Sequence, residues 1–281
     1  MQKANTYLQS ISSQGYLKIA DFCTQHKSKR PIFHAFCGKT ICRDSLPVNL
    51  DKLLKIAEQC QMINDTNPTP HNKQQALSVS LLKQVHSNRV VHVGSKYDKQ
   101  SNFIEIEEGD ALITDIPRRL LAVKTADCVP ILLHEQNSGY IAAIHAGWRG
   151  ALSGIIHNTV KKLHDIVGKC NIEAAIGPCI QQASYEVSHD FYQECLTKDS
   201  KSDTFFATKH RNNAKAEDIG QMQYYFNLPA YCISCLRDMS ISTIHQAKID
   251  TYSNPDALFS HRYILRNNLL TGRQISVIGI T

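Results

Sequence analysis

The chain has 281 residues, which is enough for one large domain or two small ones with a substantial core. Its residues are 42% hydrophobic and 20% charged, and these proportions exclude a disordered or low-complexity protein. The net charge is +6 at pH 7 without an extended Lys/Arg block, so the sequence indicates no nucleic-acid partner and slightly favours anionic small molecules.

The first residues, MQKANTYLQSISSQGY, lack the apolar segment of a signal peptide. No apolar run approaches the roughly 18 residues that a membrane-spanning helix needs. We therefore expect a cytoplasmic protein with no membrane partner. Its ten cysteines are expected to be reduced thiols rather than a disulfide framework. In that setting a cysteine near a histidine is a candidate metal ligand or nucleophile.

Alternating and continuous apolar runs predict most of the elements in the first half of the chain. A strand is expected at 31–37, a helix at 50–63 and a polar, proline-containing loop at 64–75. Further strands are expected at 76–86 and 90–94, on either side of the turn 87–89, and at 110–115 and 120–128. Residues 129–147 are predicted to form a hairpin with its turn at Gln136–Gly139.

After Gly147 the pattern changes to helical periodicity. One helical face collects Leu152, Ile155, Ile156, Val160, Leu163 and Ile166. A strand at 172–180, a helix around 188–197, a polar mobile loop at 198–221, a helix at 227–239 and a strand at 274–280 follow. Asn227 is the expected N-cap of the 227–239 helix, with Pro229 in its first turn. The interleaved elements predict an α/β (α+β) fold, a single domain with a central mixed β-sheet flanked by helices.

The hairpin brings a cysteine and a histidine to the same end of the sheet. If Glu135 pairs with Tyr140, His145 lies opposite Pro130, two residues from Cys128. A strand rises about 3.3 Å per residue, so the two side chains come within reach of a common ion.

His86 is the third candidate ligand, because it ends a strand-like run just before a polar turn. Two histidines and one cysteine suit Zn²⁺, and three protein ligands with an open fourth position are the catalytic pattern. The spacing leaves an alternative open, in which Cys128 is a small buried apolar residue and His145 is a hydrogen-bonded turn histidine.

The turn after His145 carries a second set of candidate residues. Arg149 stands near the start of the helix expected from about Gly150, where a guanidinium and free N–H groups suit a phosphate or carboxylate. Gly147 and Gly150 permit close approach of a ligand to the backbone. Trp148 is either a stacking surface for a base or a cover for the core.

Six motifs occur in order along the chain: KQVHSNRV, EGDALITD, VKTADCVPILL, IAAIHAGWRG, AAIGPCIQQASYEV and FSHRYILRNNLLTGRQ. Over about residues 76–281 the chain resembles the proteins once called polyphenol oxidases or laccase-domain proteins. That family is now described as zinc-dependent purine nucleoside phosphorylases, with bacterial members named peptidoglycan-editing factors. The resemblance implies a single domain over 1–281, with a divergent part at 1–75. It also implies a zinc site at His86, Cys128 and His145.

The activity implied by the resemblance is phosphorolysis of adenosine, inosine, guanosine and methylthioadenosine, with adenosine deamination as a side activity. Purine nucleosides and phosphate are the implied partners, and Zn²⁺ is the implied cofactor, with Cu²⁺ less favoured. The alternative is peptidoglycan editing on a muramyl nucleotide precursor. True laccase chemistry is disfavoured, because multicopper sites need paired histidines and the chain has no H-x-H pair.

Other residues of these motifs are candidates for catalysis. Asp127 is either a base or orienting group, or a strand-end cap or salt-bridge partner. Cys179 is a candidate nucleophile, but no base stands beside it in sequence, so a place in the pocket wall is the alternative. Cys232 and Cys235 form a lone C-x-x-C that is more typical of a helix core than of a zinc site.

Two arginines near the C-terminus are candidates for substrate binding. Arg262 and Arg273 would contact an anion or, alternatively, backbone carbonyls. Tyr185 and Glu186 would support the same pocket or serve packing alone. His261 stands where the family has a tyrosine.

The N-terminal part departs from the family pattern. A Thr-Arg-x-Gly-Gly loop is usual there, but residues 35–50 read AFCGKTICRDSLPVNL, with Lys39 near the arginine position and Arg43 as a substitute of unclear register. If that loop contacts substrate, the substrate preference differs in this chain.

Overall fold

The computed structural model describes residues 7, 9–11, 13–14, 16–19, 22, 32–42, 56, 77–97, 103–210 and 222–280. The helix expected at 50–63 (apart from residue 56), the loop expected at 64–75 and Arg43 lie outside these residues. Within them, no helix has both the length and the apolar character needed to cross a bilayer.

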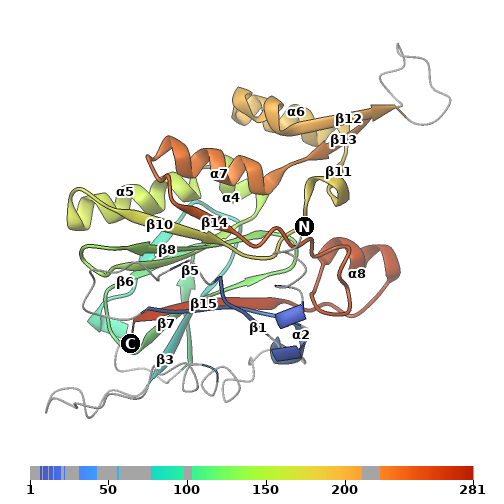
Figure 1. Ribbon diagram of the computed structural model, residues 1–281. Helices are drawn as coiled ribbons and strands as arrows, with labels where there is room; N and C mark the ends of the chain where they lie inside the picture. Colours follow the sequence, from blue (N-terminus) through green and yellow to red (C-terminus); the bar gives the residue numbers. More distant parts are fainter. Residues whose placement is uncertain are drawn as a thin grey trace, which may run out of the picture.

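The strands form two six-stranded mixed sheets in the described part of the chain (Figure 1). In order across the first sheet they are β1 (Tyr16–Leu17), β2 (Ile32–Cys37), β15 (Gln274–Ile280), β7 (Arg119–Thr125), β3 (Ser78–Lys83) and β5 (Phe103–Glu108). Across the second they are β14 (Ile244–Gln246), β10 (Ile172–Ile176), β8 (Val129–Glu135), β9 (Ile141–Ala146), β6 (Ala111–Thr114) and β4 (Val90–His92). Both sheets contain parallel and antiparallel pairs.

The two sheets pack face to face, and each has a further core on its other face, which together explain why their strands are apolar on both sides. One core lies between them and joins Leu121 and Ile278 of the first sheet to Leu132 and Ala143 of the second. A second core fills the outer face of the second sheet, where α5 (Ile155–Val167) and α7 (Leu228–Asp238) cover it (Figure 1). The predicted α/β fold with a mixed sheet is confirmed, and its strands are divided between two packed sheets.

The helices begin and end where the local sequence requires it. Ser188, Asn227 and Ser260 accept hydrogen bonds from backbone N–H groups in the first turns of α6 (His189–Lys198), α7 and α8 (His261–Asn267). Gly154, with φ of 88°, separates the short α4 (Trp148–Leu152) from α5. Further helical segments are α2 (Lys39–Cys42), η1 (Ser95–Tyr97), η2 (Gln182–Ser184) and η3 (Ser200–Phe205).

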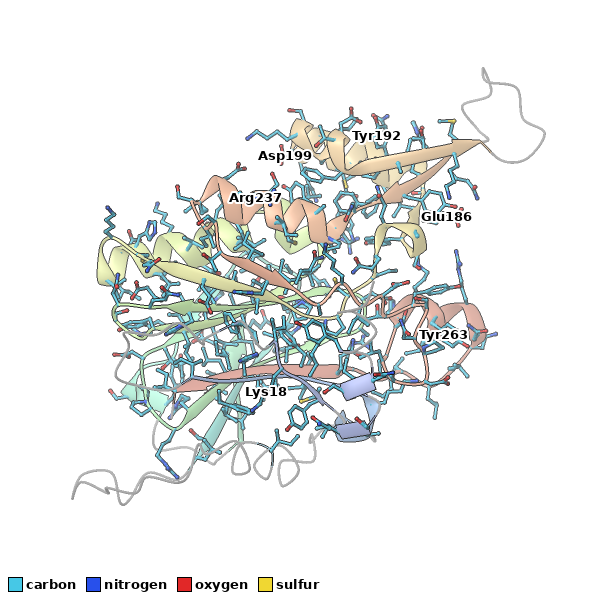
Figure 2. The ribbon with its side chains drawn as sticks, viewed as in Figure 1. Lys18, Glu186, Tyr192, Asp199, Arg237 and Tyr263 are labelled. Atoms are coloured by element: carbon cyan, nitrogen blue, oxygen red, sulfur yellow. The ribbon has the colours of Figure 1, made fainter. Side chains whose placement is uncertain are left out.

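A smaller unit projects from the second sheet beyond α7 (Figure 1). It consists of α6, η3 and a three-stranded sheet of β11 (Glu186–Val187), β13 (Met222–Phe226) and β12 (Phe206–His210). Asp199 lies at the end of α6 (Figure 2). It accepts a hydrogen bond from the hydroxyl of Tyr231 on α7 at 2.8 Å, which links the unit to the main body.

The strands predicted on either side of the turn 87–89 are present as β3 and β4, and they belong to different sheets. Two predictions about elements need correction. Residues 200–210 are not a loop, because η3 and β12 occupy them; 211–221 lie outside the described residues. Ile166 is exposed, so the apolar face of α5 ends at Leu163.

His34 on β2 is buried, and its Nε2 accepts a hydrogen bond from the backbone N–H of Ile19 at 3.0 Å. Burial, assisted by the charge of Lys18, lowers the pKa of His34 to about 3. Below the unfolded pKa of about 6.5, the unfolded chain therefore binds a proton that the folded chain rejects. His34 stabilises the fold above that pH, and its contribution is lost as the pH falls toward about 3.

We expect the unfolding free energy to lose about 2 kcal/mol through His34 between pH 7.5 and pH 5. Urea titrations of the wild type and of His34→Gln measure this, and the variant is expected to show a flatter pH dependence. His164→Gln, at an exposed histidine of α5, is the control. Equal pH dependence in all three proteins would contradict the assignment.

Candidate metal centre and adjoining pocket

The β8–β9 hairpin places Cys128 and His145 at one end of the second sheet. Pro130 pairs with His145, and the backbone N–H of Glu135 donates to the carbonyl of Tyr140. The predicted register is therefore confirmed. His145 is 3% exposed, whereas Cys128, just before β8, is partly buried.

His86 joins them from the segment after β3. Its backbone is left-handed, with φ of 59°, and its side chain is exposed. The ligand atoms of His86, Cys128 and His145 all lie within 4.8 Å of one another, and Cys128 Sγ is 3.8 Å from His86 Nε2. Within the described ranges, this is the one group of three or more metal-ligand side chains so clustered.

Asp110, which sequence reasoning missed, holds the two histidines in place. Its carboxylate is fully buried and accepts hydrogen bonds from His145 Nδ1 at 2.8 Å and from the backbone N–H of His86 at 3.0 Å. It also accepts from the N–H and hydroxyl of Ser87, at 2.6 and 2.7 Å. Burial alone would raise the pKa of Asp110, but these bonds lower it below the ordinary value. The sequence feature that could have identified Asp110 is its place in the EGDALITD motif.

The hydrogen bond from His145 to Asp110 fixes the tautomer of the imidazole. A carboxylate only accepts, so Nδ1 of His145 carries the proton and Nε2 is left for a metal. Burial raises the pKa of Cys128, but the positive charges and hydrogen bonds of His145 and His86 outweigh it and lower this pKa to about 6. Burial lowers the pKa of His145, but the Cys128 thiolate and Asp110 raise it above its ordinary value.

The cluster fits a zinc ion. Tetrahedral Zn²⁺ with bonds of about 2.0–2.3 Å needs ligand atoms about 3.3–3.6 Å apart, and the 3.8 Å between Cys128 Sγ and His86 Nε2 is close to that. A thiolate and imidazole nitrogens are the donors that zinc prefers. Three protein ligands would leave a fourth coordination position open.

Gly147 makes room for this cluster, since a Cβ there would lie 2.6 Å from His86 Cδ2 and 3.2 Å from Cys128 Sγ. Gly147→Ala is therefore expected to displace His86 and to weaken zinc binding by about tenfold or more. Competition with a chromogenic chelator measures the affinity. Gly94→Ala is the control, because a Cβ at Gly94 meets nothing within 4 Å. Unchanged zinc affinity in Gly147→Ala would show that His86 is not held as described.

Asp127 connects the candidate metal site to α8. Its Oδ1 accepts from the hydroxyl of Thr251 at 2.6 Å, and its Oδ2 accepts from the backbone N–H of Arg262 at 2.7 Å. Asp127 thus caps the first turn of α8 while its backbone, with φ of 83°, leads into Cys128. This geometry matches the alternative of a capping residue.

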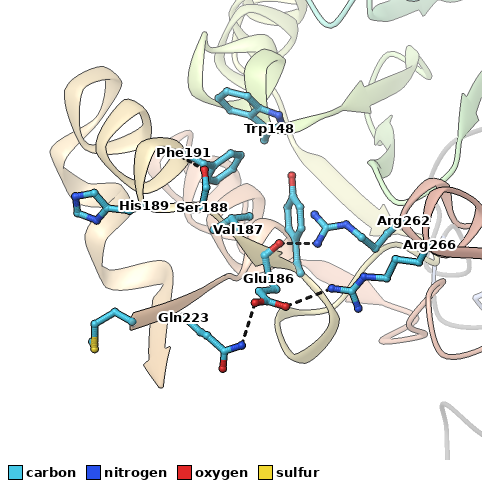
Figure 3. Close-up of a pocket in the computed structure, with 11 residues that line it drawn as sticks. Trp148, Glu186, Val187, Ser188, His189, Phe191, Gln223, Arg262 and Arg266 are labelled. Carbon is cyan, nitrogen blue, oxygen red and sulfur yellow. Dashed lines mark hydrogen bonds and ion pairs between the residues drawn. The ribbon is translucent and has the colours of Figure 1, made fainter. Parts of the chain in front are cut away.

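A pocket of about 550 Å³ is lined by residues of α4, α6, β11, β13 and α8 (Figure 3). Trp148, Tyr185 and Phe191 give it an aromatic wall, and Glu186, Gln223, Arg262 and Arg266 are among its polar lining. None of the three candidate ligands lines it, but it touches their neighbourhood through Trp148, three residues after His145, and through Arg262.

Of the predicted substrate-binding residues, Trp148 and Arg262 line the pocket, whereas Arg149 and Arg273 do not. Arg262 lines the pocket, and its guanidinium donates to the carbonyl of Glu186 at 2.6 Å. Arg149 is exposed, and its guanidinium lies 4.4 Å from the centre of the Trp148 ring. Trp148 also packs on Phe191, with ring centres 4.5 Å apart, at the edge of the helix-covered core. Arg273 is exposed outside the pocket and donates to the carbonyl of Gly272.

The prediction that Cys232 and Cys235 belong to the core of a helix is confirmed. Cys232 and Cys235 are buried on α7. Cys179 is also fully buried, and its burial raises the pKa far above that of a free thiol. This environment favours the neutral thiol and gives no support to a nucleophilic role for Cys179.

Two packed mixed sheets with a His–Cys–His cluster at one end define an α/β protein with a candidate transition-metal site. The chain belongs to the family described as "Multi-copper polyphenol oxidoreductase laccase", whose model matches residues 51–281.

Similar proteins support this membership. A Rickettsia conorii protein named purine nucleoside phosphorylase is 35% identical over 198 residues, covering 69% of this chain and 76% of that protein. A Haemophilus influenzae protein of the same name is 31% identical over 201 residues, covering 70% and 72%. The crystal structure of the Bacillus licheniformis hypothetical protein YfiH has the same fold, with a TM-score of 0.74, 21% identity, and 96% and 98% of the two chains covered.

Proposed function

We propose that this protein is a zinc-dependent purine nucleoside phosphorylase. The observation that carries the proposal is the His86–Cys128–His145 cluster, whose donor atoms and Asp110 support suit zinc, beside a pocket with aromatic and cationic walls. The names of the similar Rickettsia and Haemophilus proteins support the same reaction. A multicopper oxidase would need more ligands than the three in this cluster, so multicopper chemistry is not proposed; one thiolate and two imidazoles, with a fourth position open, suit catalytic zinc.

In phosphorolysis, a phosphate oxygen bonds to C1′ of the ribose while the C1′–N9 bond breaks and the base leaves with a proton. Each of the site residues has a separate role in this reaction. Bound zinc supplies a Lewis acid. His86, Cys128 and His145 hold it, and Asp110 keeps Nε2 of His145 directed at it. Arg149, which lies over the ring of Trp148, and Arg262, in the pocket lining, supply positive charge for phosphate. Inosine, guanosine, adenosine and methylthioadenosine are the proposed substrates, with adenosine deamination as a side activity.

The experiment is base release from inosine by the zinc-loaded protein, with and without phosphate. Formation of ribose 1-phosphate only when phosphate is present is the expected result. Base release that does not depend on phosphate would indicate a hydrolase and overturn the proposal, and so would the lack of any base release. Ammonia release from adenosine in a parallel assay tests the deaminase activity separately.

A further inference from the structure

Left-handed backbone presents two of the three candidate metal ligands. His86 itself has a φ of 59°, and Asp127, which directly precedes Cys128, has a φ of 83°. A residue with a side chain is strained in this region and stays there only where its surroundings hold it. At His86 the buried carboxylate of Asp110 does so, because it accepts the backbone N–H of His86. The turn before Cys128 needs an equivalent support.

Thr251 provides that support through the side chain of Asp127. Thr251 is fully buried, and its hydroxyl donates to Asp127 Oδ1 at 2.6 Å. The segment around Thr251 is itself fixed, because the N–H of Thr251 donates to the carbonyl of Cys179 at 3.2 Å and the N–H of Cys179 donates to the carbonyl of Ile249 at 3.1 Å. The N–H of Ile180 donates to the carbonyl of Asp127 at 3.0 Å. This turn is therefore held through both its side chain and its backbone.

The second oxygen of the Asp127 carboxylate reaches the pocket side of the site. Oδ2 accepts from the backbone N–H of Arg262 at 2.7 Å, in the first turn of α8. The guanidinium of Arg262 lines the pocket and donates to the carbonyl of Glu186 at 2.6 Å (Figure 3). One carboxylate thus joins the backbone beside a candidate metal ligand to the helical turn that carries a cation of the pocket. A shift of Asp127 would move both.

We propose that Thr251 is a positioning residue for both halves of the site; the inference rests on the proposed zinc-dependent function. Through Asp127 it directs Cys128 toward the metal and holds Arg262 in the pocket. Without the hydroxyl, Asp127 Oδ1 loses this buried hydrogen bond. The strained turn is then held by fewer bonds, so the Cys128 thiolate and the first turn of α8 both shift.

The test compares the wild type with Thr251→Val, which keeps the shape of the side chain, and Thr251→Ser, which keeps its hydroxyl. Co²⁺ bound in place of Zn²⁺ is the first readout, since the absorption of cobalt reports its thiolate bond and its geometry and needs no catalytic activity. Thr251→Val is expected to weaken the thiolate-to-cobalt band and to lower zinc affinity about tenfold. Thr251→Ser is expected to keep both close to the wild type.

Steady-state phosphorolysis of inosine at saturating zinc is the second readout. The KM for phosphate in Thr251→Val is expected to rise about fivefold, with a smaller change in kcat, because a displaced Arg262 weakens the binding of the anion. Thr251→Ser is again expected to restore the wild-type value. If the valine methyl group crowds Asp127 and the variant folds poorly, Thr251→Ala removes the same hydroxyl without that methyl group.

Thr159→Val is the matched control. Thr159 is also fully buried, and its hydroxyl donates within α5 to the carbonyl of Ile155 at 2.7 Å. The control is expected to keep the cobalt spectrum and the KM for phosphate, whatever stability it loses. An unchanged cobalt spectrum or an unchanged KM in Thr251→Val, or the same changes in Thr159→Val, would overturn the positioning role. A wild type that binds Co²⁺ but lacks phosphorolysis would overturn the proposed function, while the cobalt spectra would still decide whether Thr251 orients Cys128.

Discussion

Replacing Cys128 with serine is expected to abolish stoichiometric zinc binding and to lower kcat/KM for inosine phosphorolysis by more than about a hundredfold. The thiolate is the only anionic donor in the cluster, and the two histidines beside it favour the thiolate by lowering its pKa to about 6. A serine hydroxyl stays protonated under the same conditions and is a poor zinc ligand.

Metal analysis of the purified variants and steady-state rates measure this effect. Cys170→Ser is the matched control, because Cys170 is a partly buried free thiol whose Sγ donates to the carbonyl of Gly168 and takes no part in the cluster. It is expected to retain zinc and activity. A Cys128→Ser protein that binds zinc as tightly as the wild type would remove Cys128 from the ligand set.

Replacing Asp110 with asparagine is the second large effect we expect. An amide cannot accept all of the bonds that the carboxylate accepts from His86, Ser87 and His145, so one or more buried donors lose their partner. The NH₂ group also favours the other tautomer of His145, which places the proton on the nitrogen meant for zinc.

The expected result for Asp110→Asn is zinc affinity about 10- to 100-fold lower and an unfolding free energy about 2–4 kcal/mol lower than in the wild type. Chelator competition and urea unfolding of the metal-free protein separate the two effects. Asp165→Asn, at an exposed aspartate on α5, serves as the control. Loss of stability without loss of zinc affinity would mean that Asp110 supports the fold and not the metal ligands.

The part of the site that could be predicted from sequence is the part governed by local geometry. The turn at Gln136–Gly139 sets the register of one hairpin, and that register alone brings His145 toward Cys128. His86 is a candidate because the apolar run 76–86 predicts a strand that ends there. The structure places it next to the other two although β3, the strand before it, belongs to the other sheet.

The rest depends on contacts between segments that sequence patterns do not connect. Asp110 lies 35 residues from His145, and a buried carboxylate has no periodic signal of its own. The pocket requires Arg262 from α8 to meet Glu186 from β11 across 76 positions, whereas the similar-looking Arg273 remains outside. Cys179 resembled a nucleophile by its place after a strand, but burial among apolar side chains disfavours its thiolate.

Removal and return of the metal test the central claim most directly. The purified protein is assayed for phosphate-dependent base release from inosine, treated with a strong chelator, assayed again, and then titrated with Zn²⁺. We expect activity to disappear on chelation and to return fully at one zinc per chain, with no recovery in Cys128→Ser. Full phosphorolysis by the chelated, metal-free protein would contradict the assignment of the His86–Cys128–His145 cluster as the catalytic metal site.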